Sequence, residues 1–161
     1  MKIKGIIDED FVNYKKPSMV ILFPTCTFKC EKECGERCCQ NSALAQSPTV
    51  DTTKDVIISR YLNNSITKAV VCGGLEPMDS FFDLYSLVYT LRNTYKCLDD
   101  VVIYTGYTKN ECTNYGWLQD LMLLKNVVIK FGRFIPNQLS HYDEVLGVQL
   151  ASDNQYAERI C

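Results

Sequence analysis

Four short runs of apolar residues divide the chain and predict buried strands. They cover residues 19–23, 69–72, 101–104 and 127–131, are rich in Val and Ile, and are bounded by turn residues. Apolar runs without polar alternation are typical of strands covered on both faces, as in parallel sheets. The four runs therefore predict the centre of a mostly parallel sheet.

Helix-like segments lie between these runs. Residues 81–92 carry apolar side chains at the spacing of a core-facing helical stripe, and residues 51–62 and 117–124 predict two further helices. Strands that alternate with helices are the signature of βαβ units. A closed eight-stranded barrel needs about 250 residues, and this chain has 161. We therefore expect an α/β fold in one domain over residues 1–161, built as a partial, open β/α barrel.

An unusual loop follows each predicted strand. The first is a cysteine-rich loop, and the other three are GGLEP at 73–77, TGYT at 105–108 and GRFIP at 132–136. The carboxyl ends of parallel strands meet at one edge of a sheet, where ligands bind in such folds. The four loops therefore predict one shared site.

Charge and composition exclude several classes of protein. A net charge of −2 argues against a general binder of nucleic acid. No apolar run approaches the roughly 20 residues of a membrane span. The N-terminal segment is acidic where a signal peptide is apolar, so we expect a cytoplasmic protein. In a reducing cytosol, nine cysteines point to metal binding or catalysis rather than to disulfides.

Five of the nine cysteines crowd into the first loop, within fourteen residues: Cys26, Cys30, Cys34, Cys38 and Cys39. An odd total of cysteines argues against a complete disulfide framework. Zinc sites commonly use Cys-x2-Cys pairs or histidine, and the loop has neither, although a structural zinc site stays an alternative. Iron–sulfur clusters are held by thiolates at varied spacings. Cys26 and Cys30, followed by Cys39 before Gln40-Asn41, suggest a three-thiolate cluster with one open iron.

Four stretches of the chain resemble a known superfamily. They are CTFKC followed by CQN, GGLEP, VVIYTGYT, and FGRFIPN with ASDNQ, and they run from residue 19 to about residue 155. Together they resemble the radical S-adenosylmethionine (radical SAM) superfamily. More closely, the sequence is similar to the small activating proteins of anaerobic ribonucleotide reductase and related glycyl radical enzymes. On this resemblance, the domain has an N-terminal extension at about 1–17 and an extended cluster loop at 24–48.

The resemblance implies a role for each motif residue. Cys26, Cys30 and Cys39 would ligate three irons of a [4Fe–4S] cluster, and the fourth iron would chelate the amino and carboxylate groups of SAM. Gly73, Gly74 and Glu76 would meet the SAM amino group. Thr105 and Gly106 would line the pocket near the methionyl or ribose part. A last group would shape the same pocket near the C-terminus: Ser152, Asn154 and Gln155.

The sequence departs from the family pattern in two places. The family spacing is Cys-x3-Cys-x2-Cys, whereas eight residues separate Cys30 from Cys39. Cys38 stands where an aromatic residue commonly precedes the third cysteine. Cys39 is preferred because Gln40-Asn41 follows it, with Cys38 and then Cys34 as alternatives. The second departure is Leu75, an extra residue that leaves the direction of the Glu76 carboxylate open.

The implied function is that of a radical SAM activase. It would reductively cleave SAM and install a glycyl radical on a partner enzyme, an anaerobic ribonucleoside-triphosphate reductase, with a flavodoxin- or ferredoxin-like protein as electron donor. One alternative is a radical SAM enzyme that acts on another peptide or a small molecule. Another, from a different class, is a non-catalytic module whose cysteines hold zinc.

Overall fold

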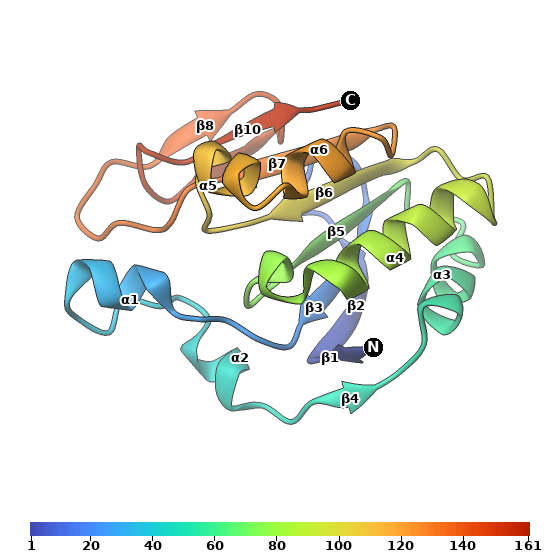
Figure 1. The fold of residues 1–161 in the computed structure, drawn as a ribbon, viewed down its shortest axis with the longest axis horizontal. Helices are drawn as coiled ribbons and strands as arrows, with labels where there is room; N and C mark the ends of the chain where they lie inside the picture. The colour runs from blue at the N-terminus through green and yellow to red at the C-terminus, as the bar shows by residue number, and fades with distance from the viewer.

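A computed structural model describes residues 1–161 and centres on one six-stranded sheet, in the order β10-β7-β6-β5-β3-β2 (Figure 1). The four inner strands are parallel to one another: β3 (Ser18–Phe23), β5 (Ala69–Gly74), β6 (Asp100–Tyr104) and β7 (Val127–Phe131). The two edge strands are antiparallel to their neighbours: β2 (Gly5–Asp10) and β10 (Tyr156–Arg159).

These strands confirm the four predicted apolar runs and the α/β class. Nearly all residues of the inner strands are buried, as their continuous apolar sequences predict. The sheet is mostly parallel and does not close, which agrees with the expected open architecture. Its assignment to a barrel of the radical SAM type stays a prediction.

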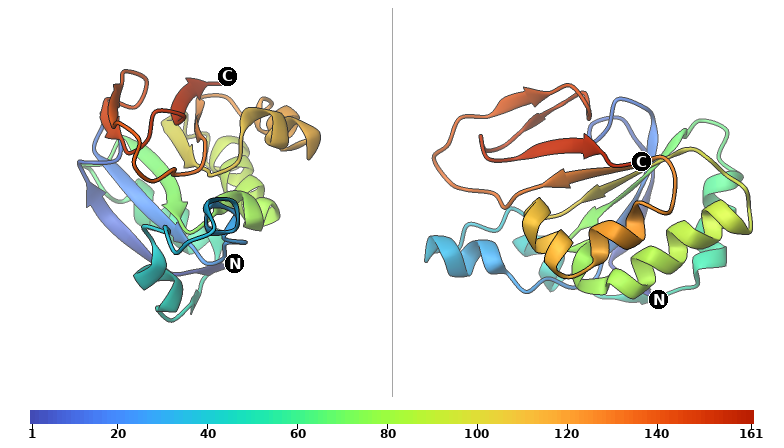
Figure 2. Two further views of the ribbon diagram at one scale, coloured as in Figure 1. Left: turned by 90° about the vertical axis from the view of Figure 1, so that its left-hand side faces the viewer. Right: turned by 45° about the horizontal axis from the view of Figure 1, so that its top comes forward.

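Helices α3 to α6 lie together on one face of the sheet, as Figure 1 and the right-hand view of Figure 2 show. Their bounds are α3 (Lys54–Leu62), α4 (Phe81–Asn93), α5 (Lys109–Asn114) and α6 (Trp117–Leu121), and a 3-10 turn, η1 (Pro77–Ser80), leads into α4. The helix predicted at 51–62 begins at residue 54, where the Thr53 hydroxyl caps it by accepting the Val56 N–H at 3.2 Å. The helix predicted at 117–124 ends at residue 121, and α5 was not predicted.

The remaining elements are short. The cysteine loop contains α1 (Lys29–Cys34) and α2 (Ser42–Gln46), and Figure 1 shows α1 beside the carboxyl ends of the parallel strands. The segment predicted as an N-terminal extension forms β1 (Lys2–Ile3), which pairs with β4 (Val50–Asp51), and the edge strand β2. A final hairpin joins β8 (His141–Asp143) to β9 (Val148–Leu150).

The core has two parts, one on each face of the sheet. The larger part packs the helices against alternate strand residues such as Ile21, Cys72 and Ile103. The smaller part covers the other face, where Val71 and Val128 meet Leu150 of the hairpin. None of the helices is both long and apolar enough to cross a membrane.

Candidate metal centre

A cavity of about 430 Å³ opens on the second face of the sheet, at the carboxyl ends of the parallel strands. It brings together residues from all the loops that the sequence singled out. The predicted residues that line it are Cys26, Cys30, Cys39, Gly73, Gly74, Glu76, Thr105, Gly106 and Gln155. The prediction that these loops form one site is therefore consistent with the geometry.

Two of the predicted site residues, Ser152 and Asn154, do not line the cavity. The Asn154 side-chain amide donates to the Arg133 carbonyl at 2.8 Å, and its amide oxygen accepts from the Ser152 hydroxyl at 2.8 Å. These contacts hold the segment after β9 against the loop after β7. Asn154 thus supports the cavity wall from outside, and direct contact with a cofactor stays a prediction for this residue.

The cysteine loop leaves β3 through a constrained turn. Phe28 has a left-handed backbone (φ 52°), and its N–H donates to the Cys26 sulfur at 3.2 Å. The Thr27 N–H donates to the Asp79 carboxylate at 2.7 Å, so the turn is fixed to the segment that follows β5. Helix α1 then begins, and it carries Cys30 in its first turn. These contacts bring Cys26 and Cys30 to the same side of the loop, facing the cavity.

The other cysteines of the loop divide into two groups. Cys39 lines the cavity, and its N–H donates to the Glu31 carboxylate at 3.4 Å. Cys34 and Cys38 lie outside the lining, with their sulfur atoms 2.7 Å apart. This division favours Cys39 over Cys38 and Cys34 as the third thiol of the site.

The segment after β5 is joined to both neighbouring loops. The Gly74 carbonyl accepts from the Asn41 side-chain amide at 2.8 Å, which connects the QN pair of the cysteine loop to the glycine motif. Glu76 is 5% exposed, and its carboxylate accepts from the Thr105 hydroxyl and from the Gly106 N–H, both at 2.8 Å. The carboxylate therefore points toward the loop after β6. Its direction, which the extra Leu75 left open in the sequence, is set by these two hydrogen bonds.

One comparison with known proteins decides the class of this site. A family model described as a 4Fe-4S single cluster domain matches residues 17–155, which is most of the chain. This span includes every cavity residue named above. The chain belongs to the 4Fe–4S single cluster domain family. Searches of curated proteins and of solved structures gave no match. Membership supports iron–sulfur binding, and with it the predicted [4Fe–4S] cofactor.

The three cavity thiols fit such a cluster chemically. No three His, Cys, Asp or Glu side chains lie close enough together to share one metal ion. A [4Fe–4S] cluster instead takes one thiolate on each iron, so its ligands approach from separate points. Burial raises the pKa of the Cys26 thiol to about 12 and also raises the pKa of Cys30. Both thiols hold their protons at neutral pH, and iron must displace them on binding.

Sequence reasoning gave no role to two charged residues of the cavity wall, Lys130 and Arg133. Lys130 is a buried lysine on β7 whose ammonium donates to the Gly132 carbonyl at 2.8 Å, and burial lowers its pKa to about 8. Tyr107 donates its hydroxyl to Asp79 at 2.6 Å, and Arg133 comes from the loop after β7. A lysine inside the apolar run VVIKF was the available signal, because an unpaired charge is rarely buried without a reason.

Glu76 gives the cluster-free chain a specific pH dependence. Burial raises the pKa of its carboxyl from 4.5 to about 7. The folded state therefore holds this proton more tightly than the unfolded state. The resulting stabilisation, about 3 kcal/mol, is complete below pH ~4.5 and is lost as the pH rises through about 7.

This contribution can be measured by urea unfolding of the wild type and of Glu76→Gln between about pH 4.5 and about pH 7.5. It is the difference between the unfolding free energies of the two chains. We expect the wild type to lose stability relative to the variant as the pH rises. Parallel stability curves for the two chains would contradict the raised pKa.

Proposed function

We propose that this chain is a radical SAM enzyme that cleaves S-adenosylmethionine reductively at a [4Fe–4S] cluster held by Cys26, Cys30 and Cys39. One observation carries the proposal: three thiols of one loop share a cavity with the GGLE and TG segments that follow the next two strands. Membership in a family of single-cluster domains supports the cluster itself. Three protein thiols would leave the fourth iron free for a substrate.

The chain's own residues would bind and orient SAM beside the cluster. Gly73 exposes its backbone to the cavity without a side chain, and Glu76 is the buried carboxylate nearest the TG segment. Lys130 offers an ammonium without a carboxylate partner, which suits the carboxylate of SAM. When bound, the cluster would supply the electron needed to split SAM into methionine and a 5′-deoxyadenosyl radical. The residues that line the cavity would orient SAM and limit the access of water to the reacting groups.

The proposed target is a backbone glycine of a partner protein. Loss of a hydrogen atom from that glycine would leave a stored glycyl radical, and the partner would be an anaerobic ribonucleoside-triphosphate reductase. A flavodoxin- or ferredoxin-like protein would supply the electron. Support for the partner and the donor comes from the sequence resemblance, above all from the YTGYT and GRFI stretches.

Product analysis tests the cleavage step. The protein is reconstituted anaerobically with iron and sulfide, reduced with dithionite and given SAM, and methionine and 5′-deoxyadenosine are quantified by chromatography with mass spectrometry. We expect both products in equal amounts, above a control without protein. A protein that assembles its cluster but forms neither product would overturn the proposal.

Gly73→Val tests whether SAM occupies this cavity. A Cβ at Gly73 meets only the Tyr104 Cβ, at 3.8 Å, so the variant is expected to fold. The added side chain would project over the lined space and should weaken SAM binding by tenfold or more, equal to ~1.4 kcal/mol. Calorimetric titration with SAM measures the affinity, and thermal unfolding checks stability. Unchanged affinity in a folded variant would place SAM elsewhere.

A further inference from the structure

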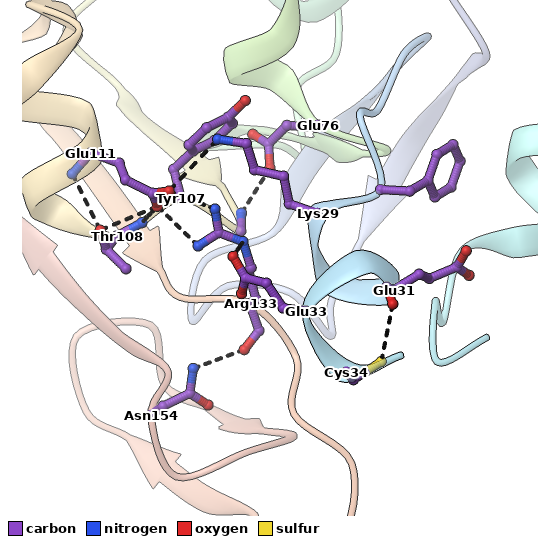
Figure 3. Close-up of polar contacts among 12 residues, drawn as sticks. Lys29, Glu31, Glu33, Cys34, Glu76, Tyr107, Thr108, Glu111, Arg133 and Asn154 are labelled. Atoms are coloured by element: carbon purple, nitrogen blue, oxygen red, sulfur yellow. Dashed lines mark hydrogen bonds and ion pairs between the residues drawn. The ribbon is translucent and has the colours of Figure 1, made fainter. Parts of the chain in front are cut away.

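A group of charged residues joins the cysteine helix to the rest of the protein. The Glu111 carboxylate, on α5, accepts two hydrogen bonds from the Arg133 guanidinium, at 2.9 and 2.7 Å. The Lys29 ammonium, on α1, lies 3.6 Å from the same carboxylate (Figure 3). Arg133 also reaches α1 through Glu33, at 3.4 Å. Together with Tyr107, these residues form what we call the charged clamp.

Lys29 is the part of the clamp nearest the candidate ligands, since it lies between Cys26 and Cys30 in the sequence. Its ammonium is 4.3 Å from the centre of the Tyr107 ring, within the range of a cation–π interaction. Figure 3 shows Lys29 extending from α1 toward Tyr107 and Glu111. Lys29 therefore fixes the segment between two cysteines to a side chain of the cavity wall.

Glu111 is itself held firmly in place. It completes a capping box with Thr108, whose N–H donates to the Glu111 carboxylate at 2.8 Å. The Arg133 side chain that it binds is only 10% exposed. A bidentate pair of this kind is stronger than an ordinary surface ion pair. The clamp thus has a rigid centre on α5 and the loop after β7.

Apolar packing contributes little to the position of α1, because none of its six residues is buried. Figure 1 shows the helix projecting from the body of the protein. Polar contacts must therefore set its position, and the clamp supplies ion pairs from α1 to α5 and to the loop after β7.

We propose that Glu111 is a positioning residue that holds α1 against the cavity through Lys29 and Arg133, and so keeps Cys26 and Cys30 in place to bind the cluster. The inference rests on ligation of the cluster by Cys26 and Cys30. It does not depend on SAM cleavage or on any partner.

The first test uses the cluster-free chain and follows the rate at which iodoacetamide alkylates Cys30, measured by mass spectrometry of its peptide. Glu111→Gln removes the charge but keeps an oxygen that can accept from Thr108, so α5 should remain capped. We expect about tenfold faster alkylation, which corresponds to ~1.4 kcal/mol. The matched control is Glu158→Gln, which removes the ion pair that Glu158 forms with Lys109 of α5, outside the clamp. Equal rates for wild type and Glu111→Gln would overturn the inference.

The second test measures cluster release from the reconstituted protein to a ferrous chelator, through the loss of visible absorbance. Lys29→Met should release the cluster about tenfold faster than the wild type, or ~1.4 kcal/mol, and Lys29→Arg should restore the slow rate. Lys32→Met is the control, because Lys32 lies on the same helix and forms no ion pair.

Because Glu111 and Lys29 act through one contact, the double variant should release the cluster less rapidly than the product of the two single effects. Fully independent effects, or a Lys32→Met variant as fast as Lys29→Met, would overturn the positioning role. A wild type that binds no cluster would refute ligation by Cys26 and Cys30, whereas cluster binding without SAM cleavage would refute only the proposed function.

Discussion

Alanine at Cys26, Cys30 or Cys39 is expected to abolish assembly of the [4Fe–4S] cluster, whereas alanine at Cys34 or Cys38 should leave it intact. The first three thiols line the cavity and the last two do not. A protein thiolate is the ligand that each iron requires, and alanine offers no replacement. Iron and sulfide content after anaerobic reconstitution, together with visible absorbance, measures the outcome.

Cys34→Ala is the matched control, since it removes a thiol from the same loop at an exposed position. Loss of the cluster in Cys38→Ala with retention in Cys39→Ala would make Cys38 the third ligand. Retention in Cys26→Ala or Cys30→Ala would contradict the placement of the cluster in this cavity.

Gly74→Ala is expected to destabilise the fold more than any other single methyl group added to the site. Gly74 ends β5 with a left-handed backbone (φ 88°), and a Cβ there would lie 2.9 Å from the Leu22 Cα and 3.0 Å from the Phe23 nitrogen. These are backbone atoms of the paired strand β3, so they cannot turn away. Backbone strain and overpacking together should cost about 2 to 5 kcal/mol. Urea unfolding of the cluster-free chain, followed by circular dichroism, gives the change in stability.

Gly35→Ala separates the two causes of that cost. Gly35 also has a left-handed backbone (φ 74°), but nothing lies within 4 Å of the position of its Cβ. It should therefore show only the conformational penalty, about 1 to 2 kcal/mol. Equal losses in the two variants would mean that β3 and β5 separate easily at this point, and that Gly74 is not required for their close approach.

The centre of the sheet could be predicted because its signal is local. Each inner strand coincides with a short apolar run in the sequence, because a strand that is buried on both faces needs apolar residues at nearly every position. The edge strands β2 and β10 were missed because their sequences, GIIDED and YAER, carry charges. Charged residues are typical of edge strands, where they discourage pairing with other chains, and in a sequence they resemble loops.

The site could be predicted only as far as strand topology extends. Parallel strands place their loops at one edge, so Cys26, Gly73 and Thr105 were correctly expected to lie together. The choice between Cys38 and Cys39 could not be made in this way, because adjacent residues of an irregular loop can point in either direction. The direction of the Glu76 carboxylate likewise depends on hydrogen bonds from Thr105 and Gly106, which lie far from it in the sequence.

The charged clamp lies beyond sequence reasoning for the same reason. Nothing near Lys29 in the sequence predicts a contact with Glu111, which lies far along the chain on α5. Pairs of this kind form through the fold and cannot be read from spacing.

Electron paramagnetic resonance of the anaerobically reconstituted and reduced protein, recorded with and without SAM, tests most directly whether SAM binds at the cluster. We expect the spectrum of a reduced [4Fe–4S] cluster, with a signal that changes when SAM is added, because SAM would coordinate the iron that lacks a protein thiolate. A cluster spectrum that SAM leaves unchanged, or a protein that takes up zinc and assembles no cluster, would contradict the proposed function.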